Sequence, residues 1–161
     1  MEMMGIILAI LGAALSSALA GIGSSIGCGI TGQTAAGVTT EDPGKFGKTL
    51  VLQALPGTQG IYGFIGLFFV LNITGLLRGE PLPLTVDQGW QICFACLPVG
   101  VVGLISAVYQ GMVASSGCGA LAKRPEVFGK AVIYAAMVET YAILGLLSTI
   151  LLLMGIQLPT G

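Results

Sequence analysis

Charged residues divide the chain into four long apolar runs. Three clusters of charges separate uncharged runs that cover residues 3–40, 49–77, 88–122 and 131–161, and only Glu139 interrupts the last run. Each run exceeds the roughly 20 residues that a helix needs to cross a bilayer. The alternation of apolar and polar residues over about ten positions that marks membrane β-strands is absent. The pattern therefore predicts an all-α membrane protein with four transmembrane helices.

The composition also indicates that the bilayer is the solvent of this chain. Its 161 residues are 55% apolar and only 8% charged, whereas soluble domains carry roughly 25% charged residues. Histidine is absent and the formal net charge is -1, so the sequence offers no basic surface for nucleic acid. Membrane lipid is the expected surrounding, and nucleic acid is not an expected partner.

Basic residues predict the orientation of the four helices. The first and third loops of such a chain lie on one side of the membrane, and they hold Lys45, Lys48, Lys123, Arg124 and Lys130, whereas the second loop holds only Arg78. By the positive-inside rule, the first and third loops are cytoplasmic and both termini are not. The leading segment carries Glu2 and no basic residue, so we expect a retained helix and not a cleaved signal peptide. The expected location is the cell membrane.

Motifs in the first half of the chain recur in the second half in the same order. Phe46-Gly47-Lys48 recurs as Phe128-Gly129-Lys130, Gly27-Cys28-Gly29 recurs as Gly117-Cys118-Gly119, and Tyr62 corresponds to Tyr141. Two tandemly duplicated hairpins are therefore predicted, at residues 1–78 and 88–161, with a non-cytoplasmic loop at 79–87. In the register of the two tyrosines Glu139 falls opposite Gly60. Only the second hairpin then has a carboxylate inside the membrane.

Small residues are concentrated in the first and third predicted helices, for example at Gly21, Gly27, Gly103 and Gly111. Small residues let helix backbones approach closely in lipid. This fits either an inner layer packed around the axis of an oligomer or ordinary packing within one chain. Both interpretations stay open at this point.

The sequence gives no support for catalysis in this chain. No nucleophile and base can be paired, because histidine is absent and every acid except Glu139 lies in a loop or near the N-terminus. Cys93 and Cys96 have the spacing of a redox motif but lie inside a predicted span without another ligand. We expect them to be buried apolar residues, with no transition metal. The chain is therefore not expected to be an enzyme.

Glu139 carries the functional interpretation. A carboxylate inside a span costs a few kcal/mol or more, so it must be protonated, paired with a cation or in contact with water. No Lys or Arg lies at the same depth in the sequence pattern. One alternative is a protonated Glu139 that only donates a hydrogen bond between helices. The favoured hypothesis is a reversible site for H+ or another small cation.

Polar residues in the second and third spans point to the cation. Pro56 and Gly57 interrupt the second span and free backbone carbonyls. The hydroxyl of Thr58, the amide oxygens of Gln59 and Gln110, a freed carbonyl and the carboxylate offer about five oxygens, as a hard cation requires. Na+ is therefore the predicted ligand, without an organic cofactor. The alternative is back-bonding by Thr58 and plain interhelical hydrogen bonds by the two glutamines.

These residues resemble a known family. The segments Leu55-Pro56-Gly57-Thr58-Gln59-Gly60-Ile61-Tyr62-Gly63, Gln110-Gly111 and Ala135-Ala136-Met137-Val138-Glu139-Thr140-Tyr141 are similar to the K or c proteolipid, the membrane rotor subunit of V-type ATPases, in its bacterial Na+-transporting form. The resemblance implies a ring of identical subunits. That ring turns against a stator membrane subunit of the a or I type that carries an Arg, driven by ATP hydrolysis in a soluble head.

The resemblance also implies roles for single residues. Na+ would be bound by Glu139, Thr58, Gln59, Gln110 and the Leu55 backbone carbonyl, while the Tyr62 hydroxyl would hold the carboxylate as a latch. The loop residues Lys45, Lys48, Lys123 and Arg124 would be candidate contacts to a central-stalk coupling subunit. Two alternatives remain, a proton-carrying V-type proteolipid and a stand-alone four-helix transporter coupled to a cation.

Overall fold

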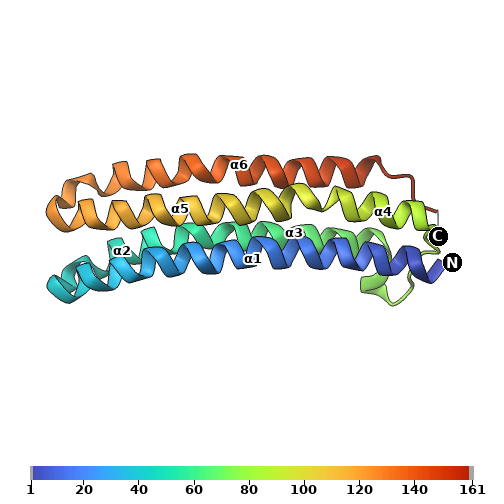
Figure 1. The fold of residues 1–161 in the computed structure, drawn as a ribbon, viewed down its shortest axis with the longest axis horizontal. Helices are drawn as coiled ribbons and strands as arrows, with labels where there is room; N and C mark the ends of the chain where they lie inside the picture. Colours follow the sequence, from blue (N-terminus) through green and yellow to red (C-terminus); the bar gives the residue numbers. More distant parts are fainter. Residues whose placement is uncertain (1, 160–161) are drawn as a thin grey trace.

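The computed structural model describes residues 2–159, which form a bundle of four long helical rods (Figure 1). The first rod is α1 (Glu2–Glu41), the second comprises α2 (Phe46–Ala54), η2 (Leu55–Gly57) and α3 (Thr58–Ile73), the third comprises α4 (Val86–Ala95) and α5 (Leu97–Lys123), and the fourth is α6 (Phe128–Gly155). All four rods are long and apolar enough to cross a membrane. The predicted all-α fold with four spans is confirmed.

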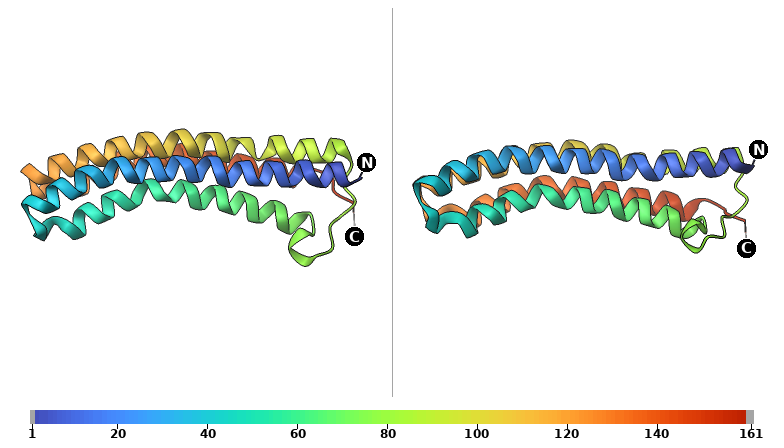
Figure 2. Two further views of the ribbon diagram at one scale, coloured as in Figure 1. Left: turned by 60° about the horizontal axis from the view of Figure 1, so that its bottom comes forward. Right: turned by 90° about the horizontal axis from the view of Figure 1, so that it is seen from below.

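The rods form two layers, with α1, α4 and α5 in one layer and α2, α3 and α6 in the other (Figure 2). The most extensive contact joins α1 to α5, and the contact between α3 and α6 is far smaller. Glycine permits this close approach, because a Cβ atom on Gly23 would lie 2.6 Å from the Cα atom of Leu104, and one on Gly111 would overlap the backbone of Gly27. Packing within the chain therefore accounts for these glycines, whereas Gly21 and Gly29 face open space.

The two hairpin turns lie at one end of the bundle (Figure 1). The short 3-10 helices η1 (Pro43–Lys45) and η4 (Pro125–Val127) form these turns, and another 3-10 helix, η3 (Leu76–Arg78), belongs to the loop at the opposite end. That loop turns at Gly75, whose φ of 76° suits glycine. Thr85 and Gln88 then form a capping box that starts α4. The first and third loops therefore share one end, as four consecutive spans require.

Two of the four rods are interrupted inside the predicted spans. The break at η2 follows from Pro56, as the sequence predicts. A second break, between α4 and α5 at Cys96, was not predicted, although Pro98 lies at the start of α5. The Val99 N–H donates to the hydroxyl of Thr149 on α6, with a nitrogen-to-oxygen distance of 3.1 Å. This side chain supplies the partner that an irregular backbone needs in a membrane.

The structure corrects the register of the internal repeat. The turn η1 leads into α2 at Phe46 just as η4 leads into α6 at Phe128. The same interval also relates Ser24 to Ser106 and Gly63 to Gly145, so one constant register relates the two hairpins. In this register Glu139 corresponds to Gly57 and not to Gly60, and the matches Gly27-Cys28-Gly29 with Gly117-Cys118-Gly119 and Tyr62 with Tyr141 are out of step.

Candidate ion-binding site

The carboxylate of Glu139 is held by hydrogen bonds from two other rods. Glu139 lies near the middle of α6 and is partly buried. The hydroxyl of Tyr62 on α3 donates to its Oε1 atom over 2.6 Å, and the amide of Gln110 on α5 donates to Oε2 over 3.3 Å. The one salt bridge found among residues 2–159 does not involve this carboxylate. Its charge therefore meets only neutral donors within the described chain.

A buried chain of amide and hydroxyl groups extends from this carboxylate. Gln59 and Gln110 are both fully buried, and the amide of Gln59 donates to the side-chain oxygen of Gln110. The same Gln59 amide approaches the Ser106 hydroxyl at 3.4 Å, and Ser106 donates to the Val138 carbonyl over 3.0 Å. An unpaired buried polar group costs about 1–3 kcal/mol. The network therefore locks α3, α5 and α6 together at one depth.

The break in the second rod brings further oxygens to the same place. Pro56 has no N–H and disfavours a regular helix, so Leu55–Gly57 forms a 3-10 turn. The Leu55 carbonyl accepts hydrogen bonds from the backbone N–H of Thr58 and from its hydroxyl, the latter at 2.9 Å. Donating this proton leaves the lone pairs of the Thr58 oxygen available. That hydroxyl also lies 3.3 Å from the Gln59 side-chain oxygen.

The structure thus gathers all five side chains named from the sequence, together with the Leu55 carbonyl, along one connected network. The back-bond of Thr58 and the interhelical bond between Gln59 and Gln110 are both formed. Neither bond is incompatible with a cation site, because the oxygens of the Thr58 hydroxyl and the Gln110 amide each keep a free lone pair for a metal ion, whereas the Leu55 carbonyl already accepts two hydrogen bonds. One carboxylate among neutral oxygens balances the charge of one monovalent cation.

Two serines were missed by the sequence reasoning. Ser106 connects Gln59 to α6, as described above. Ser24 on α1 accepts a hydrogen bond from the Gly60 N–H over 2.7 Å, which fixes α1 against the first turn of α3. The sequence does hold a signal for both, because the constant register of the repeat aligns Ser24 with Ser106.

The first hairpin lacks an equivalent of the carboxylate site. Its position equivalent to Glu139 is Gly57, and its position equivalent to Gln110 is Cys28. A Cβ atom on Gly57 would lie 3.6 Å from the Cys28 sulfur. The backbone framework of the site is therefore repeated, but its ionisable group and amide are replaced by glycine and a thiol.

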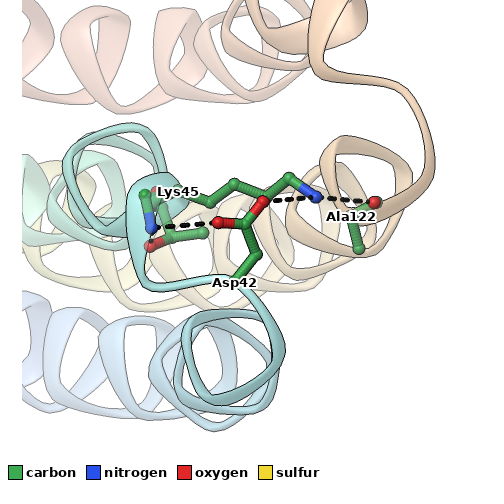
Figure 3. Close-up of polar contacts among 5 residues, drawn as sticks. Asp42, Lys45 and Ala122 are labelled. Carbon is green, nitrogen blue, oxygen red and sulfur yellow. Dashed lines mark hydrogen bonds and ion pairs between the residues drawn. The ribbon is translucent and has the colours of Figure 1, made fainter.

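Two of the four basic residues that are candidate contacts to a central stalk are engaged within the chain. The Lys45 ammonium lies 2.9 Å from the Ala122 carbonyl and 3.3 Å from the Asp42 carboxylate (Figure 3). It thereby joins the first hairpin turn to the C-terminal end of α5, where the helix dipole favours a cation. The Lys48 ammonium lies 5.9 Å from the centre of the Phe128 ring.

The other two candidate contacts remain available. Lys123 and Arg124 are both exposed, at the third loop. The structure describes no ion pair for either of them within residues 2–159. Both side chains are therefore accessible for an ion pair with another molecule.

Comparison with known proteins supports the resemblance drawn from the sequence. The family of the ATP synthase C subunit matches residues 11–70 and again residues 93–152, one match in each hairpin. The V-type sodium ATPase subunit K of Enterococcus hirae is 45% identical over 93% of this chain and 92% of its own length. The A-type ATP synthase subunit K of Methanocaldococcus jannaschii is 46% identical over 94% of this chain and 64% of its own length. With its duplicated hairpins, the chain belongs to the family of the ATP synthase C subunit.

Proposed function

We propose that this chain is a rotor subunit of a V-type ATPase that carries Na+ across the membrane and does not itself catalyse ATP hydrolysis. The family membership and the name of the Enterococcus hirae relative support the rotor and the ion. The observation that carries the proposal is the network in which Tyr62 and Gln110 donate to the Glu139 carboxylate and Gln59 donates to Gln110. A proton site needs one acceptor, whereas this network supplies the several oxygens that Na+ requires.

In the proposed site the ion is bound by the Glu139 carboxylate, the amide oxygens of Gln59 and Gln110, the Thr58 hydroxyl and the Leu55 carbonyl. The Gln59 amide turns so that its oxygen faces the ion in place of its present bond to Gln110. Tyr62 keeps its hydrogen bond to the carboxylate and holds it toward the ion. When the ion binds, the elements that carry these groups keep their positions and only the Gln59 amide changes its orientation; when the ion is released, the Glu139 carboxylate swings away from Tyr62.

Transport follows from the charge balance of this site. With Na+ bound, the charge of Glu139 is neutralised and the site can face lipid, whereas the bare carboxylate is held back by the cost of desolvation. The stator Arg competes for the carboxylate and displaces the ion where water reaches the site. Identical subunits in a ring pass this point in turn. One carboxylate per four spans gives each ion a larger share of the torque of one rotation, which favours pumping.

The hairpin turns face the cytoplasm in this proposal, in accord with their basic residues. They meet the central-stalk coupling subunit there. Lys123 and Arg124 are the better candidates for that contact, because Lys45 and Lys48 are engaged within the chain. The loop at the other end and both chain ends then face away from the cytoplasm.

The proposal is tested by labelling membranes with a carboxyl-modifying carbodiimide at fixed pH. We expect Glu139 to be the labelled residue and Na+ to slow its labelling more than equimolar K+ does, because a bound ion occupies the carboxylate. The variant Glu126→Gln, which removes a carboxylate of the third loop, is the matched control and should leave both results unchanged. Labelling of Glu139 that is indifferent to Na+ would favour the proton-carrying alternative.

A further inference from the structure

A groove lies on the first hairpin at the end near the turns. It has a volume of about 430 Å³, and its lining includes Gly32, Ala36 and Thr39 of α1 and Thr49 and Gln53 of α2. All of its lining residues belong to the first hairpin. The groove is therefore a feature of that hairpin alone, and the second hairpin of the same chain does not cover it.

Leu52 of the first hairpin packs over the corresponding face of the second hairpin. In the constant register of the repeat the groove residues correspond to Ala114, Cys118, Leu121, Ala131 and Ala135. Those five residues form a buried cluster with Leu52, which is fully buried. The groove on the first hairpin therefore corresponds to the surface of the second hairpin into which Leu52 packs.

The residue that corresponds to Leu52 in the second hairpin is Tyr134. Its side chain is 68% exposed, so most of its surface is not covered within the chain. Each of the two surfaces matches the polarity of the side chain that corresponds to it. Leu52 enters an apolar pocket, whereas the groove replaces Leu121, Ala131 and Ala135 by Thr39, Thr49 and Gln53, and tyrosine brings a hydroxyl.

We propose that Tyr134 of one copy of this chain inserts into the groove between α1 and α2 of a second copy, with its hydroxyl among Thr39, Thr49 and Gln53. The inference rests on the proposed ring and deepens it, because the contact between copies then repeats the contact between hairpins. Such a head-to-tail contact joins two different faces and closes into a ring through successive rotations. In lipid, where no hydrophobic force drives association, this side-chain fit and its polar contacts hold the copies together.

The test is a thiol cross-linking experiment in membranes that contain the assembled chain. The double variant Gln53→Cys with Tyr134→Cys is treated with an oxidant or a short bifunctional thiol reagent. We expect a ladder of covalent multimers on a denaturing gel without reductant, because each copy joins the next. The parent chain, which has four cysteines, and each single variant should give no ladder.

Ile133 provides the matched control, since it is adjacent to Tyr134, is 63% exposed and corresponds to the exposed Val51. The pair Gln53→Cys with Ile133→Cys should cross-link at least tenfold less. The proposed contact is overturned if both pairs give an equal ladder, or if rings that native mass spectrometry shows to be intact give no ladder. Neither result contradicts the ring itself. A parent chain that native mass spectrometry finds only as monomers or dimers overturns the ring itself.

Discussion

Replacing Tyr62 by Phe removes a single hydrogen bond from the proposed site. The hydroxyl donates to the Glu139 carboxylate over 2.6 Å, and a hydrogen bond to a charged group contributes about 1.5–3 kcal/mol. The bond breaks when the carboxylate swings out to release the ion, so it forms part of the barrier to release. If about 1.4 kcal/mol of it is lost before release, Tyr62→Phe releases Na+ about tenfold faster.

The release rate is measured by loading purified rings with 22Na+ and diluting them into unlabelled Na+. Tyr141→Phe is the control, because it removes a hydroxyl from an exposed tyrosine that the structure does not bond to Glu139. We expect faster release only from Tyr62→Phe, with the ring intact. Equal release rates for the parent and Tyr62→Phe would show that the hydroxyl does not retain the carboxylate.

Three further predictions follow from other contacts. Gln110→Ala removes a proposed ligand oxygen and should raise the Na+ concentration for half-maximal transport about tenfold or more; an unchanged value would make Gln110 a packing residue. Thr149→Val leaves the buried Val99 N–H unpaired and should destabilise the chain by about 1–3 kcal/mol, measured as a lower temperature of ring dissociation that Thr149→Ser does not show. Lys45→Met removes the link to Ala122 and should lower that temperature by a smaller step without changing Na+ affinity; a change in affinity would contradict this assignment.

The sequence predicts the spans well, because the charged residues of this chain, apart from Glu139, are confined to its ends and loops. The break at Pro56 is also predictable, since proline removes a backbone donor wherever it lies in a helix. The break near Pro98 was missed because its partner Thr149 is distant in the sequence and belongs to another rod. Long apolar runs show where helices lie but not which of their backbone groups are satisfied from a neighbour.

The residues of the site could be named from the sequence, but their connections could not. The pattern identifies Glu139, Gln59 and Gln110 as polar groups at membrane depth. It does not show that Gln59 donates to Gln110 or that Ser106 joins α3 to α6, because these contacts depend on the approach of α5 to α3. The register predicted for the repeat is wrong because short Gly-rich and Tyr-containing motifs recur in this chain out of step with the one constant interval that relates the hairpins.

The central claim is that ATP hydrolysis drives Na+ through this chain by way of Glu139. The most direct measurement is ATP-driven 22Na+ uptake by vesicles that contain the whole ATPase complex, in the presence of a protonophore that collapses any proton gradient. We expect uptake to persist under these conditions and to be abolished by Glu139→Gln, which leaves no negative charge for the ion to neutralise. ATP-driven acidification without 22Na+ uptake, or full uptake by the Glu139→Gln variant, would contradict the central claim.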